Sequence, residues 1–254
     1  MPQAAALPRV PRLSHVRKLT RLAIATDLRA AEWIVESLTT FAESVLSLVP
    51  GGFPAYVRVF HHAHKRVGND VVHVRWTEIA AANGRTAHAG MQLCALTGGE
   101  NEYAPQPGVY DLPPNTWSLP RSLLPPLLEV VSRHTQTPDR CWFAVWYGFG
   151  GLRPELREGP TFPTPGREYF LLSGPLERAM ENLGDYPWVQ SPSIWWPDDH
   201  AWCVATEVDL RTTYIGCSES CRDDLLARPE LEAYEIDPAT GIDARSDRVN
   251  VEMM

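Results

Sequence analysis

Residues 141–147 read Cys-Trp-Phe-Ala-Val-Trp-Tyr, an apolar run whose side chains would face both sides of an extended strand. Such a strand is typical of the middle of a sheet that is covered on both faces. Residues 201–210, Ala-Trp-Cys-Val-Ala-Thr-Glu-Val-Asp-Leu, predict a second strand, with residues 213–217 as a strand that pairs with it. These stretches predict a protein built around a buried sheet.

The patterns outside these stretches predict short strands separated by short helices. Residues 55–60 alternate as a half-buried strand, and residues 71–76 read as its antiparallel partner across a loop at 61–70. Further strands are expected at 168–172 and 231–236. Short helices are expected at 78–83, 125–134, 220–227 and between a Ser173 cap and Gly184. Because few of these helices could connect parallel strands, the pattern favours an α+β fold with a largely antiparallel central sheet and flanking helices.

One amphipathic helix is expected near the N-terminus, over residues 30–48. Its apolar residues recur at helical spacing: Ile34, Leu38, Phe41, Val45 and Leu48. Residues 50–52, Pro-Gly-Gly, would end the helix. The stripe is interpreted as core.

The chain is divided by charge. Residues 1–28 are predicted to be a basic, flexible leader, because residues 1–26 carry five basic side chains and no acid. Residues 29–254 are predicted to form a single α+β domain, with a subdomain boundary as the alternative in the Pro- and Gly-rich stretch 98–120.

The balance of charge and apolar residues excludes several partners. The formal charge of the 254 residues is −8, and residues 27–254 hold 18 basic against 31 acidic side chains, a net charge of −13. An acidic body repels phosphates, so we expect no nucleic acid to bind through it. We also expect no membrane span, because no apolar run approaches the roughly 18–20 residues that a span needs.

The use of cysteine and arginine predicts a bacterial, cytoplasmic protein. The five cysteines are an odd number spread over a long chain, which suits reduced thiols, and the leader lacks the apolar core of a signal peptide. Arginine supplies 21 of the 23 basic residues, a bias that fits a GC-rich coding genome.

Motifs of several enzyme classes are missing. A phosphate-binding G-x-x-x-x-G-K-[ST] loop, a G-x-S-x-G elbow and an H-E-x-x-H helix do not occur. The glycine-rich turn at 146–151 follows a buried strand, but its spacing departs from dinucleotide-binding turns, so it is interpreted as a turn under packed aromatic rings. No cofactor is predicted.

Two groups of residues in the sequence are of types that bind metal ions. His61, His62 and His64 could hold a cation with Asp70 or His73 as a further ligand, but the neighbouring Lys65 and Arg66 oppose a positive ion. Cys217 and Cys221 lack a second pair of ligands. We therefore predict no metal site.

Residues 195–200, Trp-Trp-Pro-Asp-Asp-His, give the candidate binding surface. The predicted binding residues are Trp195, Trp196, Asp198, Asp199 and His200. Aromatic side chains anchor interfaces and acidic rims attract basic partners, so the sequence favours a non-catalytic protein that binds a basic protein or a small-molecule ligand. The alternative for the same residues is a core pair of indoles beside a solvated loop.

The alternative function is that of a metal-assisted hydrolase or transferase. Its candidate catalytic residues are Asp198, Asp199 and His200, with Glu207 and Asp209 as further carboxylates. The carboxylates would hold a divalent ion or act as general base, and His200 would act as acid or ligand. A third possibility is that basic residues 9–21 dock on an anionic surface.

Overall fold

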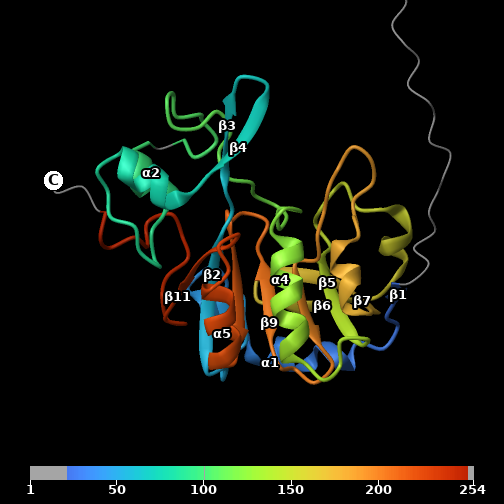
Figure 1. Cartoon of the computed structure of the whole chain (residues 1–254). Coiled ribbons are helices and arrows are strands. Elements are labelled where there is room, and N and C mark those ends of the chain that lie inside the picture. The colour runs from blue at the N-terminus through green and yellow to red at the C-terminus, as the bar shows by residue number, and fades with distance from the viewer. Residues whose placement is uncertain (1–21, 100, 251–254) are drawn as a thin grey trace, which may run out of the picture.

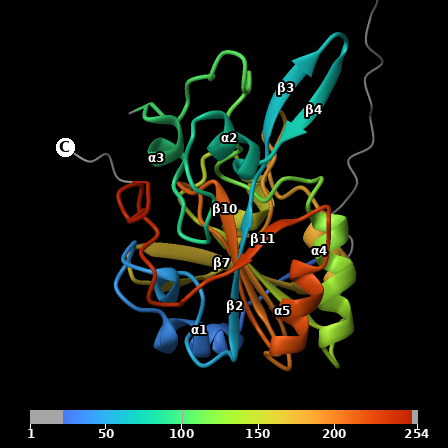
Figure 2. The same ribbon diagram turned by 60° about the vertical axis from the view of Figure 1, so that its left-hand side comes forward.

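The computed structural model describes residues 22–99 and 101–250. These residues form an α+β fold with a nine-stranded sheet, in which every pair of neighbouring strands is antiparallel, and a separate two-stranded hairpin that projects from the body (Figures 1 and 2). The α+β class and the largely antiparallel sheet are confirmed.

The strands of the sheet follow the order β1-β7-β5-β8-β9-β10-β2-β11, with β6 also paired to β7. Their bounds are β1 (Ala23–Ile24), β2 (Ala55–Phe60), β5 (Cys141–Trp146), β6 (Thr161–Thr164), β7 (Arg167–Gly174), β8 (Ile194–Pro197), β9 (Cys203–Thr206), β10 (Thr212–Cys217) and β11 (Glu232–Glu235). The projecting hairpin consists of β3 (Ala63–Val67) and β4 (Asp70–Val74).

The helices are short. The α-helices are α1 (Glu32–Ser37), α2 (Trp76–Ala82), α3 (Leu93–Thr97), α4 (Leu124–Val131) and α5 (Glu219–Leu226). The 3₁₀ helices span Arg29–Ala31, Val45–Ser47, Ser132–His134, Pro154–Glu158 and Leu176–Met180. No helix in the described ranges is long and apolar enough to span a membrane.

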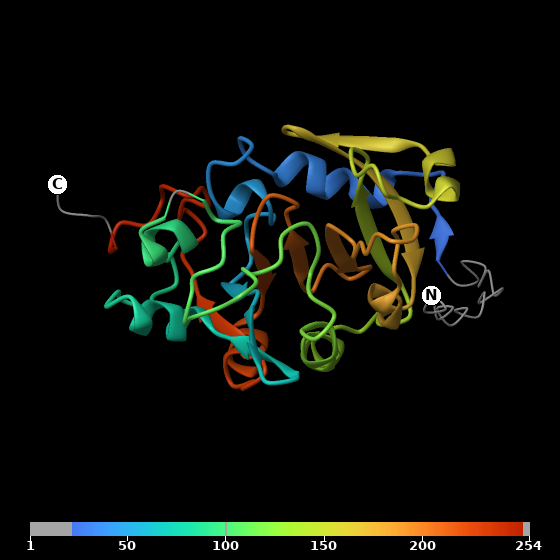
Figure 3. The ribbon, with the colours of Figure 1, turned by 90° about the horizontal axis from the view of Figure 1, so that it is seen from above.

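The sheet is covered on both faces, as the run at 141–147 predicts. In β5, Phe143 and Val145 pack into the core under α4 and α5, whereas Ala144 packs into the core beside α1. Figure 3 shows the sheet between α1 on one side and α4 and α5 on the other. Apolar residues on both faces of a central strand are therefore buried in two separate cores.

A third core lies beside the sheet, under α2, α3 and the root of the hairpin. Trp76, Ile79 and Met91 pack there against Phe60 of β2. Arg58, also of β2, is fully buried and donates hydrogen bonds from Nη1 to the carbonyls of Ala89 and Met91, each at 2.9 Å. The Arg58 guanidinium thus joins the part of the chain that carries α2, α3 and the third core, called here the small unit, to the main sheet.

The expected N-terminal helix over 30–48 is wrong in length. Helix α1 ends at Ser37, Leu38 takes an extended conformation (ψ 135°), and Ala42 takes a left-handed one (φ 61°). The stripe is nevertheless core, since Ile34, Val45 and Leu48 are all buried. Packing against the sheet therefore overrides helical periodicity here.

The predicted pairing of 55–60 with 71–76 is also wrong. Strand β2 pairs with β10 and β11, and β4 pairs with β3, which occupies part of the expected loop at 61–70. All six residues of β2 are buried. The strand therefore belongs inside the large sheet, where two neighbours satisfy both of its edges.

Two further predicted elements differ from the structure, one in length and one in type. The strand expected over 201–210 stops at Thr206, because the chain turns and the Leu210 N–H donates to the carbonyl of Glu207. In place of the helix expected after Ser173, β7 continues to Gly174 and a short 3₁₀ helix follows. The pairing of the 201–210 segment with 213–217 is confirmed by β9 and β10.

Most of the predicted leader, residues 1–21, lies outside the described residues. Residues 23–24, which the prediction placed in it, instead form β1 and pair with Ser173 and Leu172 of β7. The stretch 98–120 contains no helix or strand among its described residues. The single domain over 29–254 remains a prediction.

The topology gives the sheet two ends that carry different segments. Strands β2, β5 and β9 run in the same direction, and β8 and β10 run opposite to them. The end at which β2, β5 and β9 finish, called here the loop end, carries the hairpin and the segments 147–152, 184–193 and 207–211. The segment 198–202 lies at the opposite end.

Candidate functional site

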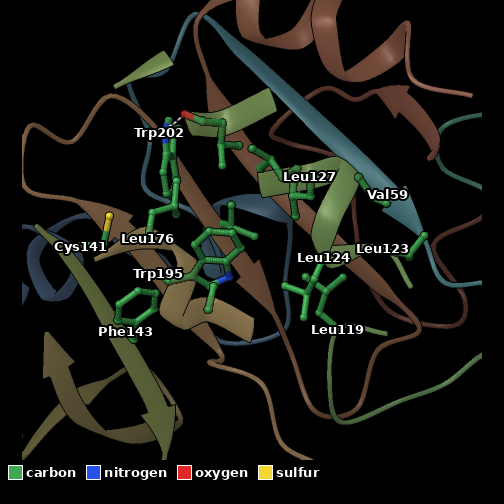
Figure 4. Close-up of a cluster of buried hydrophobic side chains, with 14 of the residues drawn as sticks. Val59, Leu119, Leu123, Leu124, Leu127, Cys141, Phe143, Leu176, Trp195 and Trp202 are labelled. Carbon is green, nitrogen blue, oxygen red and sulfur yellow. Dashed lines mark hydrogen bonds between the residues drawn. The ribbon is translucent and has the colours of Figure 1, made fainter. Parts of the chain in front are cut away.

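Trp195 and Trp196 do not form a surface. They are neighbours on β8 and point to opposite faces of the sheet, Trp195 into the core under α4 and Trp196 into the core beside α1. Their exposed fractions are 1% and 0%. Figure 4 shows Trp195 among Phe143, Leu124 and Trp202. The prediction that they contact a partner is wrong, because a central strand buries both of its faces.

The carboxylates of Asp198 and Asp199 form hydrogen bonds and an ion pair that fix the turn after β8 to neighbouring segments. Asp198 accepts a hydrogen bond from Trp142 Nε1 at 3.0 Å and pairs with Arg140. Asp199 accepts from the Gln136 N–H at 2.6 Å and from Thr135 Oγ1 at 2.9 Å. Burial acts to raise the pKa of Asp199, but these bonds and that from the Ala201 N–H outweigh it and hold the pKa below its ordinary value.

We expect Asp199→Ala to lower the free energy of unfolding by about 1 kcal/mol, because it leaves the donors on Thr135 and Gln136 without their carboxylate partner. Urea unfolding at pH 7 measures the change. Asp209→Ala is the matched control, since the Asp209 side chain is 75% exposed and should change the free energy by less than about 0.5 kcal/mol. Equal effects from the two variants would contradict the structural role of Asp199.

His200 is held in a turn against an indole. Its backbone is left-handed (φ 53°), its N–H donates to the carbonyl of Pro197, and its ring stacks on Trp33 at 4.2 Å between centroids. Burial lowers the pKa of His200, although the charges of Asp198 and Asp199 act to raise it. The side chain therefore closes the turn at the end of β8.

Glu207 and Asp209 lie at the other end of the sheet from these residues. The four residues of β9 separate them from the 198–202 segment, and both bind Arg167, whose Nη2 is 2.6 Å from Glu207 and 2.7 Å from Asp209. The predicted carboxylates and His200 therefore do not converge. Among the described residues, no group of three His, Cys, Asp or Glu side chains is arranged to hold a metal ion.

The histidines of 61–64 divide into two environments. His61 is fully buried, with Nδ1 2.7 Å from the carbonyl of Asn115 and Nε2 3.0 Å from Thr213 Oγ1. His62 turns to the hairpin, where its Nδ1 lies 3.2 Å from Nδ1 of His73. Burial lowers the pKa of both His61 and His62 to about 4. The rings of His61 and His62 are therefore neutral at pH 7, and they lie where the hairpin joins the body, called here the hairpin root.

The glycine-rich turn at 146–151 fits closely under aromatic rings, as the sequence predicts. A Cβ on Gly148 would lie 2.2 Å from the Trp146 ring, and one on Gly151 would lie 2.5 Å from Cγ of Trp188. Both glycines are thus required by close approach of an indole. The close approach of Gly151 to Trp188 fixes the Trp188 side chain at the molecular surface.

The structure brings together three aromatic side chains at the loop end, Trp117, Phe149 and Trp188, called here the aromatic platform. The two indoles are nearly parallel, with centroids 6.3 Å apart and an interplanar angle of 9°. The buried ring of Phe149 meets each of them edge-on. Trp117 is 46% exposed and Trp188 is 49% exposed. About half of each indole therefore remains available to a partner.

The backbone holds both indoles rigidly. Trp117 has a left-handed conformation (φ 78°), its N–H donates to the carbonyl of Val208, and its carbonyl accepts from Gln190 Nε2. The Trp188 N–H donates to the carbonyl of Asp185, and its carbonyl accepts from Asn182 Nδ2. A left-handed tryptophan costs roughly 1–3 kcal/mol, and such strain clusters at functional sites.

The surroundings of the platform extend the apolar surface. Val189 is 51% exposed and Tyr186 is 94% exposed, both in the segment that carries Trp188. A pocket of about 350 Å³ opens beside the indoles and is bordered by Ser118, Arg121 and Val189. Contiguous exposed apolar groups of this kind mark interaction sites more often than single exposed residues do.

A larger pocket of about 910 Å³ lies between α3 and the C-terminal segment. Its buried carboxylate, Asp247, already accepts hydrogen bonds from Asn250 and from the Gln92 N–H and contacts His88. The Cys94 thiol donates to the carbonyl of Ala244, and burial raises its pKa. These groups are committed to joining the C-terminal segment to α3.

Sequence reasoning missed the platform because its tryptophans lie in isolation. Trp117 lies in the unpatterned stretch 98–120, and Trp188 follows the turn residues Gly184–Pro187. The sequence did contain one indication of this site. Each tryptophan lies among turn-forming residues, outside any strand or helix predicted from the spacing of apolar residues. The aromatic cluster in the sequence favoured Trp195 and Trp196 instead, but those two residues cluster because they belong to a buried core strand.

Comparison with known proteins gives no match to a family model, to a curated protein or to a solved structure. Assignment of the site therefore depends on the geometry of these side chains.

Proposed function

We propose that the chain is a non-catalytic binding protein of the cytoplasm, and that its aromatic platform contacts an apolar and basic segment of a partner protein. The observation that carries the proposal is the pair of nearly parallel, half-exposed indoles on a hydrogen-bonded backbone. Tryptophan is enriched among residues that dominate binding energy, and a rigid anchor loses little entropy on binding.

Two properties favour a basic segment. The indole is the best aromatic partner for a cation, above all for the guanidinium of arginine. The chain carries a formal charge of −8, so long-range attraction would speed the encounter with a basic partner. An arginine side chain could lay its apolar stem and its charged head on the same indole face.

The enzyme alternative receives no comparable support. Its four carboxylates divide between the two ends of the sheet, and each is already bonded to a structural donor. Asp198 accepts from Trp142 and Asp199 from Gln136, whereas Glu207 and Asp209 both accept from Arg167. A general base or a divalent ion would need several of them at one place.

The proposal is tested with three sets of synthetic 12-residue peptides of equal mean hydropathy, containing arginine, glutamate or neither. We expect the arginine set to bind most tightly in fluorescence anisotropy. Trp117→Ala and Trp188→Ala should each weaken that binding by about tenfold or more, as expected when an anchor residue is truncated.

The matched control is Tyr103→Ala, which removes an aromatic side chain that is 68% exposed but lies outside the platform. It should leave the affinity unchanged within about twofold. Equal binding of all three sets, or full binding by the Trp117→Ala/Trp188→Ala double variant, would overturn the proposal. Binding of free arginine amide as tightly as the peptides would overturn the protein partner in favour of a small ligand.

A further inference from the structure

The β3–β4 hairpin projects from the body, and among the described residues β4 has a neighbouring strand on one edge only (Figures 1 and 2). Residues 70–73 of β4 are all exposed, and the exposed fractions of Val71 and Val72 are 57% and 41%. Isolated two-stranded hairpins are marginally stable in water. An exposed hairpin with valines at the centre of one strand therefore gains from a further neighbour.

The two edges of this hairpin differ. The edge of β3 is covered, because the His64 N–H donates to the carbonyl of Leu112 and the His64 carbonyl accepts from the N–H groups of Asp111 and Leu112. The hairpin's lysine and arginine, Lys65 and Arg66, are also on β3. Over residues 22–99 and 101–250, β4 pairs with β3 alone.

Natural proteins protect free edges with lysine, proline or a bulge. Strand β4 reads Asp-Val-Val-His-Val, so it has neither lysine nor proline, and its five residues pair with β3 in an unbroken register. Its one formally charged residue, Asp70, is at the end of the strand. The unprotected backbone edge is therefore suited to pairing with another strand.

We propose that β4 pairs antiparallel with β4 of a second copy of this chain about a two-fold axis at Val72, giving a four-stranded sheet across the dimer. Val72 is the middle residue of β4, so this register pairs all five residues and places it opposite Val72 of the partner subunit. The two Asp70 carboxylates then lie roughly 14 Å apart along the strands, where salt screens their repulsion. Self-pairing thus brings no like charges together.

The test is the oligomeric state of the full chain, measured by sedimentation velocity over a concentration series from about 1 to 200 µM, because so small an interface predicts a weak dimer. We expect a monomer–dimer equilibrium. V72K places two lysines opposite each other and should raise the dimer dissociation constant by about tenfold or more. V72E should do the same, and an equimolar mixture of V72K and V72E should restore the dimer.

Val249→Lys is the control, since Val249 is 55% exposed and lies outside the hairpin. It should leave the equilibrium unchanged. Circular dichroism confirms folding of each variant, and V71K on the opposite face of β4 gives an independent disruption. A monomer at every concentration, a dimer insensitive to V72K, or a mixture that stays monomeric would overturn the proposal. None of these outcomes depends on the aromatic platform.

Discussion

Trp195→Ala is expected to lower the free energy of unfolding by about 3–5 kcal/mol, the usual cost of removing a buried tryptophan side chain. Trp195 is 1% exposed and meets Trp202 edge-on at 5.2 Å between ring centroids. Truncation leaves a cavity between β8 and α4 that the rigid sheet cannot close. Urea unfolding monitored by far-ultraviolet circular dichroism measures the loss.

The matched control for this prediction is Trp188→Ala. Trp188 is 49% exposed, so its truncation should cost roughly half as much, about 1.5–2.5 kcal/mol, although it removes the same atoms. The two variants thus separate a core indole from a platform indole. If Trp195→Ala proved as mild as Trp188→Ala, the burial of β8 on both faces would be contradicted.

Acidification from pH 7 to pH 4.5 is expected to destabilise the protein by several kcal/mol. The pKa of His61 and of His62 is about 4 in the folded protein, against 6.5 in an unfolded chain. Between these values the unfolded chain binds the extra protons, so stability is complete above pH 6.5 and falls as the pH approaches 4. The loss is up to about 3 kcal/mol for each histidine.

The charges around the two rings strengthen the shift. Beyond burial, the groups that lower the pKa of His61 are His62, Arg211 and Arg58, and those that lower the pKa of His62 are His73, Arg75 and His64. Glu78 opposes the shift at His62, and the hydrogen bond to the Asn115 carbonyl opposes it at His61. The groups that lower the two pKa values therefore act in the same direction as burial and favour the neutral rings.

Urea unfolding at pH 7.5, 6.5, 5.5 and 4.5 measures this dependence. His62→Gln should reduce the slope between pH 6.5 and 4.5, since one group that titrates only in the unfolded chain is removed. The exposed Asp209→Asn variant should keep the wild-type slope. A free energy of unfolding that stays level from pH 7.5 to 4.5 would contradict the buried, neutral state of both rings.

The parts of the fold that the sequence predicted are those decided by local pattern. The run at 141–147 is a central strand because its apolar residues fill both faces. The helix predicted over 125–134 corresponds to α4, which begins one residue earlier and ends at Val131, because Pro125 and Pro126 are tolerated in a first turn. The prediction of a single helix over residues 30–48 was wrong because the same apolar stripe can be buried either by a helix or by an irregular segment that packs against a sheet. Local spacing does not distinguish the two.

The candidate site could not be read from local pattern at all. Trp117, Phe149 and Trp188 come from three separate segments, and the loop end of the sheet alone brings them together. Clustering in the sequence drew attention to Trp195 and Trp196, but adjacent residues on a strand point to opposite faces. Two neighbouring indoles in a central strand are thus separated by the sheet itself.

The buried guanidinium of Arg58 has a consequence for how the molecule comes apart. Its Nη1 bonds to Ala89 and Met91 of the small unit, and its charge lies over the rings of Phe60, Trp76 and Tyr214. Detaching the small unit would remove these hydrogen-bond acceptors from the Arg58 guanidinium while its side chain remained on β2 within the sheet. Partial opening is therefore penalised, and the two bodies should melt together in one calorimetric transition.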